Sequence, residues 1–286
     1  MLAMARLTFV EGSRKKIFLL TLLLSLLFLL LYGLALEFAS REMLRLQAGP
    51  QQVMIQQIIG QQLLGSGLYF ASFILALLAL LASVGSIASE VENGLLHSIV
   101  SKPIRRWEIV LGKFLGFATM LVAYALLLYL AVLAINRAYN PIALTLAGPE
   151  NVFLGALLFA WQPVVLLSIA LLFSTLLRTI TAGIVAVLFY SLGSIGGFLE
   201  QIGSMVARTD LVNIGIVISL FMPNDAIFRK LMAVVTTPDG NNPMQALAVG
   251  PFGISLPPSD MMVGYTLFYV FAILGLAIYF FQRRDL

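Results

Sequence analysis

The chain has 286 residues, of which 60% are hydrophobic and 10% are charged, whereas an ordinary soluble domain has about 45–50% apolar and about 25% charged residues. A water-soluble fold could not bury so much apolar surface, so the composition excludes one and predicts a membrane protein. The absence of cysteine excludes disulfide frameworks, thiolate metal sites and cysteine nucleophiles. The net charge of +4 does not indicate nucleic-acid binding, because the basic residues lie beside apolar runs and form no stretch interleaved with aromatic residues.

Six runs of the chain are long and apolar enough to cross a bilayer. A helix rises about 1.5 Å per residue, so about 20 apolar residues cross the hydrocarbon layer of about 30 Å. Backbone amides in lipid must be paired within their own segment, and no run alternates like a barrel strand, so each is predicted as a helix. We therefore predict an all-α polytopic membrane helix bundle, one domain over residues 1–286, with transmembrane helices at 17–36, 68–88, 114–135, 152–177, 182–199 and 261–281.

The first run, residues 17–36, is predicted to stay in the mature protein as an anchor. A cleavable signal peptide has a shorter apolar centre of about 7–15 residues.

Basic residues are distributed unequally between the two sides of these spans. The side of the N-terminus holds Arg6, Arg14, Lys15, Lys16, Lys102, Arg105, Arg106, Lys113, Arg178, Arg283 and Arg284, and the other side holds Arg41, Arg45, Arg137, Arg208, Arg229 and Lys230. The positive-inside rule therefore predicts that both termini are cytoplasmic. Residues 89–113 are then a cytoplasmic segment and residues 200–260 an extracytoplasmic region.

Within that region, residues 214–222 are apolar but too short to cross the membrane. They are followed by Pro223, Asn224 and Asp225. The stretch is predicted to be an external or re-entrant segment, and the even number of spans argues against a further crossing.

Several kinds of chemistry are missing from the sequence. A P-loop needs Gly, four residues and then Gly-Lys-Ser/Thr, but residues 60–66 lack the lysine and Gly112-Lys113 is followed by Phe114. The single histidine, His97, has no partner for a zinc site and is interpreted as structural. No catalytic, cofactor-binding or metal-binding residue is therefore predicted, and the chain is predicted not to be an enzyme. No span has an ionisable residue in its interior, which disfavours coupling to protons or sodium ions.

The most polar feature within a span is Gln162-Pro163. Proline removes a backbone donor and frees the carbonyl one turn earlier, so these residues form either a kink satisfied within the bundle or a contact on a translocation path.

Residues 89–113 contain the most informative pattern. Two acids, Glu90 and Glu92, precede a stripe of aliphatic residues at one-turn spacing, namely Leu95, Leu96, Ile99 and Val100. Lys102-Pro103 ends this short helix, and Arg105, Arg106 and Trp107 lead into the third span. The pattern suits either an interfacial membrane anchor or docking into a groove on a cytoplasmic partner.

This segment resembles the signature region of ABC-2 type permeases, in which Glu-x-Glu-x-Gly-Thr is followed by aliphatic residues, Pro, Arg and a closing Gly-Lys. The matching residues are Glu90, Glu92, Gly94, Pro103, Arg105 or Arg106, Gly112 and Lys113, whereas Leu95 stands where the pattern has threonine. The resemblance extends to Thr8–Glu11, Arg14–Lys16, Pro223–Asp225, Phe228-Arg229 and Arg283–Leu286. It is closest to the subgroup of the nitrous-oxide reductase maturation permease.

The resemblance implies a type V exporter-like transmembrane domain in a bacterial or archaeal cytoplasmic membrane. Such a permease pairs with a second copy or homologue and with two separate ATPase subunits that hold ATP and magnesium. It implies that residues 1–16 form an N-terminal interfacial helix and that 89–113 is the ATPase-coupling segment, with Glu90, Glu92, Gly94, Leu95, Leu96, Ile99, Val100, Pro103, Arg105, Arg106, Gly112 and Lys113 as its contact residues.

Two functions fit these observations. The first is the permease of an ABC exporter, and the second is a non-transporting, ATPase-coupled membrane subunit that assembles or matures an extracytoplasmic partner. Intramembrane catalysis is weakly supported, because the spans contain no nucleophile and base pair.

Overall fold

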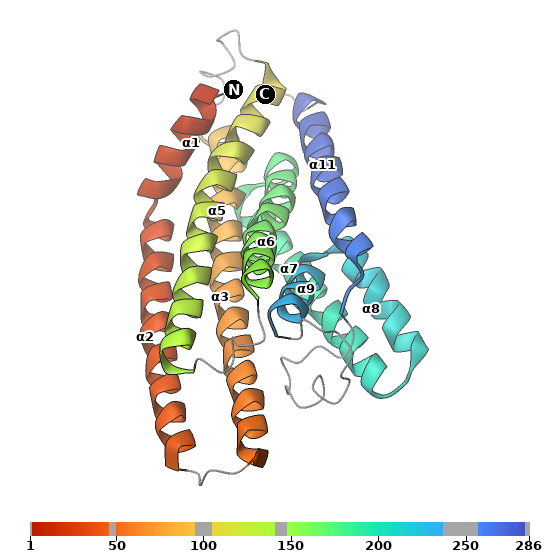
Figure 1. The fold of residues 1–286 in the computed structure, drawn as a ribbon. Coiled ribbons are helices and arrows are strands. Elements are labelled where there is room, and N and C mark those ends of the chain that lie inside the picture. The colour runs from red at the N-terminus through yellow and green to blue at the C-terminus, as the bar shows by residue number, and fades with distance from the viewer. Residues whose placement is uncertain (1, 46–49, 95–104, 141–147, 237–256, 284–286) are drawn as a thin grey trace.

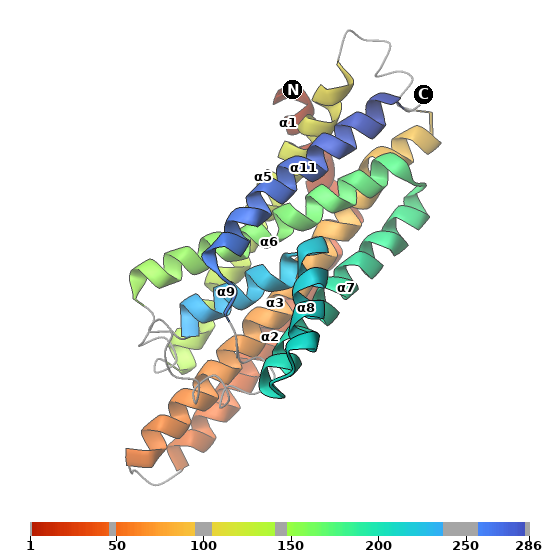
Figure 2. The ribbon, with the colours of Figure 1, turned by 90° about the vertical axis from the view of Figure 1, so that its right-hand side faces the viewer.

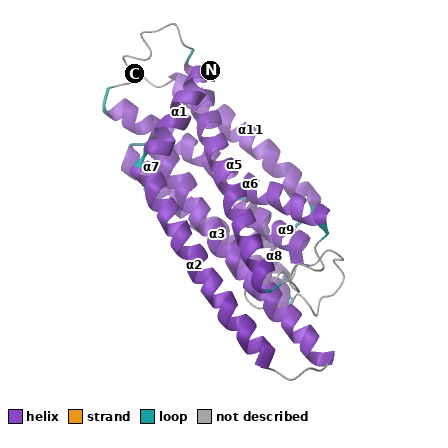
Figure 3. Ribbon diagram, turned by 60° about the vertical axis from the view of Figure 1, so that its left-hand side comes forward, coloured by secondary structure: helices purple, strands orange, loops and turns teal. Residues whose placement is uncertain are grey.

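The computed structural model describes residues 2–45, 50–94, 105–140, 148–236 and 257–283. Figure 3 shows helices joined by loops, with no strand in these ranges. The helices are α1 (Leu2–Arg14), α2 (Lys16–Arg45), α3 (Pro50–Glu92), α5 (Arg106–Tyr139), α6 (Pro149–Leu176), α7 (Thr179–Met205), α8 (Thr209–Phe221), α9 (Asn224–Thr236) and α11 (Asp260–Arg283).

The predicted all-α bundle with six membrane-spanning helices is confirmed. Within the described ranges, six helices are long and apolar enough to cross a membrane: α2, α3, α5, α6, α7 and α11. The helices extend beyond the predicted apolar runs. The 43 residues of α3, for example, make a helix of about 65 Å, more than twice the thickness of the hydrocarbon layer.

Both chain ends lie at the same end of the bundle, here termed the terminal end (Figure 1). At the opposite, distal end, the end of α2 and the start of α3 project beyond the other helices (Figures 1 and 2).

Helix α6 forms the core of the bundle. Helices α3, α5, α7, α9 and α11 pack against it. Residues 162–171 are buried without interruption, so every side of this part of α6 faces protein. A helix that is apolar on all sides is stable in such a position, because no polar face has to reach water.

Helices α1 and α2 lie along α5. Gly116 allows the close approach of α1, since a Cβ at this position would lie 2.5 Å from the Ala5 carbonyl oxygen. Further along, the Tyr124 hydroxyl donates to the Thr21 carbonyl oxygen at 3.2 Å. The N-terminal helix is thus present as α1, packed on α5; its position at a membrane surface stays a prediction.

The outer faces of α2 and α7 are apolar. Exposed side chains include Leu19, Leu20, Leu23, Leu27, Ile184, Leu188 and Leu192. We expect these faces to contact lipid or a second membrane subunit, because such large exposed apolar surfaces are rare in water.

Residues 214–222, predicted to be external or re-entrant, form most of α8 and its C-cap. Helices α8 and α9 meet at a bend of 107°, the geometry of a broken span or a re-entrant loop. Two tyrosine hydroxyls of α11 stabilise this break: Tyr265 donates to the Leu220 carbonyl oxygen at 2.8 Å and Tyr269 to that of Phe221 at 2.6 Å. They supply partners for carbonyl groups that the end of α8 leaves free.

A buried ionic cluster joins α7 to α9. The Arg229 side chain, 2% exposed, contacts Glu200 at 2.6 Å and Asp225 at 3.0 Å. The prediction that the spans lack ionisable residues holds for 182–199 but not for the whole helix, because α7 continues to Met205 and includes the buried Glu200. Region 200–260 therefore begins inside α7 and contributes two packed helices.

We expect Arg229→Met to destabilise the protein by about 3–5 kcal/mol, because it leaves two buried carboxylates without their cation. The matched control is Lys230→Met, which removes the pair of Lys230 with the 94% exposed Asp260 and should cost less than about 1 kcal/mol. Thermal unfolding in detergent measures both. Equal melting temperatures for the two variants would show that the cluster does not hold α9 to α7.

Candidate functional site

The predicted coupling residues flank a segment that the structure describes only at its two ends. Glu90, Glu92 and Gly94 lie at the end of α3, and Arg105, Arg106, Gly112 and Lys113 lie at the start of α5. The other predicted contacts, Leu95, Leu96, Ile99, Val100 and Pro103, lie outside the described residues, as does His97. The predicted short helix is therefore untested.

A buried ion pair connects the end of α3 to the start of α5. The Lys113 Nζ lies 2.6 Å from the Glu90 Oε1, and the Lys113 side chain is 3% exposed. Nζ also donates to the backbone carbonyl oxygen of Ser86, one turn before Glu90. A buried ammonium group is stable only with such partners, so this lysine fixes the two helices to each other.

Gly94 permits the sharp end of α3. Its φ of 68° lies in the left-handed region, which favours glycine because a Cβ would strain this backbone. The Asn93 and Gly94 N–H groups donate to the carbonyl oxygens of Ser89 and Val91. The chain therefore leaves α3 directly after the two motif glutamates.

Glu92 caps the start of α7. Its Oε1 accepts from the Thr179 backbone N–H at 3.0 Å, and its Oε2 accepts from the Thr179 hydroxyl at 2.9 Å. The N-cap residue, Arg178, makes no side-chain cap hydrogen bond. A carboxylate at a helix N-terminus satisfies a free N–H group and interacts favourably with the helix dipole, so Glu92 binds α7 to the end of α3.

Two further contacts complete the site. The hydroxyl oxygen of Ser174, near the end of α6, accepts from the backbone N–H groups of Ile87 at 3.1 Å and Ala88 at 3.0 Å. The Arg106 Nη1 donates to the Gln282 carbonyl oxygen at 3.0 Å in the last turn of α11. The two ends of the predicted coupling segment therefore contact α7 and α11 as well as each other, and the residues of α3 just before the segment contact α6.

The partners Ser86, Ser174 and Thr179 are not identified by the sequence. Thr179 has one local signal, because a threonine that follows Arg178 and precedes an apolar run is typical of a helix start. Nothing local indicates that its partner lies 87 residues earlier in the chain.

Gln162 lies in the core and not on an open surface of the chain. It is 1% exposed, and in the described part of the chain neither of its side-chain polar atoms has a hydrogen-bond partner. Pro163 is buried beside it within α6. The sequence alone allows two interpretations of Gln162-Pro163, a kink satisfied within the bundle and a contact on a translocation path. The structure adds a third, in which the Gln162 amide is buried without partners at a cost in free energy.

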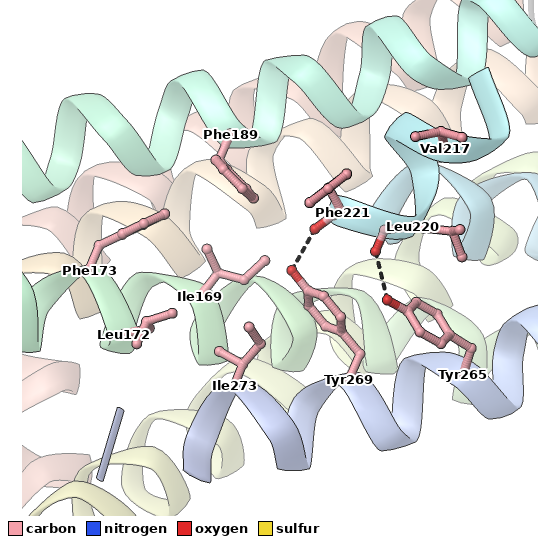
Figure 4. Close-up of a pocket in the computed structure, with 10 residues that line it drawn as sticks. All are labelled: Ile169, Leu172, Phe173, Phe189, Val217, Leu220, Phe221, Tyr265, Tyr269 and Ile273. Carbon is pink, nitrogen blue, oxygen red and sulfur yellow. Dashed lines mark hydrogen bonds between the residues drawn. The ribbon is translucent and has the colours of Figure 1, made fainter. Parts of the chain in front are cut away.

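A separate apolar pocket of about 410 Å³ lies between α6, α7, α8 and α11 (Figure 4). Its polar wall atoms include the Tyr265 and Tyr269 hydroxyls, which already bind the end of α8. The sequence did not predict this pocket. Among the residues that the structure describes, no group of three or more histidine, aspartate and glutamate side chains is placed to hold a metal ion.

The model of the ABC-2 family transporter proteins matches residues 2–286 of the chain. The chain belongs to the ABC-2 transporter family. No curated protein matches it in a sequence comparison.

Membership in the ABC-2 family confirms the broad predictions. The chain is a multi-pass membrane protein and a permease of the ABC transporter kind. Members of this family are membrane components that are not themselves catalytic and normally work with ATPase subunits. The match covers the whole bundle and does not distinguish subgroups within the family.

We expect Gln162→Leu to raise the stability of this conformation by about 1–3 kcal/mol, because it removes a buried amide without a partner. Gln61→Leu is the matched control, since the buried Gln61 amide donates to the Thr236 carbonyl oxygen at 3.0 Å, and its loss should destabilise the protein. Thermal unfolding of both variants in the same detergent is the measurement. Destabilisation by Gln162→Leu would mean that the amide has partners in the folded protein.

Proposed function

We propose that this chain is the permease half of an ATP-driven exporter and that a separate ATPase subunit binds residues 89–113. One observation carries the proposal: both described ends of this segment are joined by ionic or hydrogen-bonding contacts to the transmembrane helices. A subunit that displaces the segment therefore acts on several helices at once. A simple membrane anchor would need only apolar contacts with lipid.

The proposed contact residues differ in role. Glu90, Glu92, Gly112 and Lys113 fix the segment to the bundle, and Gly94 sets the point where the chain leaves α3. We assign the surface for the ATPase to the exposed Arg105 and to the apolar stripe, namely Leu95, Leu96, Ile99 and Val100 with Pro103. Arg106 borders this surface and also joins the segment to α11.

In the proposed complex, two ATPase subunits hold ATP and magnesium, and two permease copies or homologues form the transmembrane part. The terminal end of the bundle faces the cytoplasm of a bacterium or archaeon, because most basic residues lie on that side. ATP-dependent closure of the ATPases moves residues 89–113 and favours a second arrangement of the helices.

A second candidate is a non-transporting, ATPase-coupled subunit that assembles or matures an extracytoplasmic partner. The projecting ends of α2 and α3 favour it, since they extend the distal end of the bundle beyond the other helices (Figures 1 and 2). Transport of candidate solutes into inverted vesicles separates the two candidates. ATP-dependent uptake supports the exporter, and ATP turnover without uptake of any solute supports the second candidate.

We expect Arg105→Glu to weaken binding of the ATPase about tenfold, which corresponds to about 1.4 kcal/mol. Arg105 is exposed at the N-cap of α5, so its substitution leaves the fold intact. The matched control is Arg137→Glu, an exposed arginine in the last turn of the same helix, at the distal end. Titration of the purified ATPase onto each variant in nanodiscs gives the affinities. If both variants bind like the parent protein, the ATPase does not contact the start of α5.

A further inference from the structure

Helix α7 has a polar attachment at each end. Near the terminal end, Thr179 donates to the Glu92 carboxylate, and at the distal end Glu200 accepts from Arg229 of α9 at 2.6 Å. Glu200 lies 21 residues after Thr179, a helical rise of about 32 Å that is close to the hydrocarbon thickness of about 30 Å. The two attachments are therefore separated along α7 by about the thickness of the hydrocarbon layer.

The fully buried residues of α7 between these attachments are small, and the aromatic residues Phe189 and Tyr190 pack against the core at the edge of this face. Apart from Glu200, the fully buried residues of the helix are only alanine and glycine: Ala182, Ala186, Gly193, Gly196, Gly197 and Gly203. Small residues let helices approach closely but give no ridges that lock into the grooves of a neighbour. Near the terminal end, Gly183 and Gly85 face side chains across the α3–α7 contact at ordinary van der Waals distance. Helix α7 can therefore shift against α3 with little repacking.

The distal half of α7 is packed much more tightly, and its neighbours there are α8 and α9. A Cβ at Gly193 would lie 2.5 Å from the Met222 side chain, and one at Gly197 would overlap the Asp225 carboxylate. Together with the Glu200–Arg229 pair, these contacts make the distal half of α7 a single unit with the bend between α8 and α9.

The last turns of α3 are attached to three other helices. Ser174 holds the backbone of Ile87 and Ala88 to the central helix α6. The turn beyond this point carries Glu90 and Glu92 and leads into the proposed ATPase-binding segment. A displacement of the segment therefore moves the last turn of α3 together with Lys113 of α5 and pulls on Thr179 through Glu92.

We infer that α7 is a rigid strut that transmits displacement of the coupling segment to the α8–α9 pair at the distal end. Glu92 is the positioning residue that holds the start of α7, where the displacement arrives. The Glu200–Arg229 pair attaches the distal part of α7 to α9, where the displacement is passed on. The inference rests on the proposed function, because the ATPase supplies the displacement.

The chain contains no cysteine, so spin labels can be attached to introduced cysteines without removing others. One label is placed at Asn213, exposed on α8, and the other at Glu150, exposed in the first turn of the central helix α6. Double electron–electron resonance then measures the distance between α8 and the core. The complete permease–ATPase complex is measured in nanodiscs without nucleotide and after trapping with ATP and vanadate.

Thr179→Pro is the decisive variant. Proline removes both donors to Glu92, the amide N–H and the hydroxyl, yet it is favourable at the first position of a helix. Arg178 already has the extended backbone, with φ −71° and ψ 156°, that a residue before proline requires. Thr179→Ala removes only the hydroxyl. Thr209→Pro makes the same substitution at the first residue of α8, after an extended Arg208, and is the matched control.

We expect ATP trapping to shift the Asn213–Glu150 distance in the parent complex and in Thr209→Pro. The shift should decrease in Thr179→Ala and fall to less than half in Thr179→Pro, when both are compared with Thr209→Pro in complexes of equal ATPase content. A shift in Thr179→Pro as large as in Thr209→Pro overturns the strut, and so does the absence of a shift in a parent complex that binds the ATPase and turns over ATP. Failure of the parent chain to bind any ATPase instead overturns the proposed function.

Discussion

A helix that starts, ends or bends at membrane depth must find hydrogen-bond partners for its free backbone groups within the protein. This constraint determines which helices of the bundle are attached to each other. The bend after α8 receives the hydroxyls of Tyr265 and Tyr269 from α11, and the last residue of α9, Thr236, receives the Gln61 amide from α3. The start of α7 receives the Glu92 carboxylate.

These attachments join helices that differ in how tightly they are packed. Helices α3, α5 and α6 form a core of large interdigitating side chains such as Phe117, Tyr129 and Phe159, which resists small displacements because packed interiors have few voids. The fully buried residues of α7 are alanine, glycine and Glu200. Phe189 and Tyr190 add partly buried contacts with the core, and ionic and hydrogen-bonding contacts join α7 to other helices near its ends. A force applied at the end of α3 therefore deforms the core least and displaces α7 most.

The sequence predicted the six spans because an uncharged run of about 20 residues has few alternatives to a membrane helix. It did not predict how far the helices continue beyond these spans, since α3 begins at Pro50 and α7 continues to Met205 through polar residues that hydropathy assigns to loops. It also predicted the break near Pro223, where proline, asparagine and aspartate follow an apolar stretch.

For the contacts of the site, the sequence identified residues of the motif but not which residues they bind. The motif identified Glu90, Glu92 and Lys113, but not that Glu92 binds α7 and Glu90 binds Lys113. Such pairings depend on the rotation of each helix about its axis, which packing between distant segments sets. Glu200 was missed for a related reason: its buried position depends on Arg229, which lies 29 residues later in another helix.

A transporter must adopt at least two conformations, and the buried Gln162 destabilises the one described here. A buried amide without partners costs about 1–3 kcal/mol, a large part of a net stability that is about 5–15 kcal/mol in ordinary proteins. Gln162 lies in α6, the helix on which the other core helices pack. It is next to Pro163, where the helix already lacks a backbone hydrogen bond. In a conformation that hydrates Gln162, the buried amide gains hydrogen-bond partners and this cost disappears. The free-energy difference between the conformation described here and one that opens around α6 is therefore smaller than it would be without Gln162. Differences of a few kcal/mol are the range in which a ligand such as ATP on a partner subunit can change which state is populated.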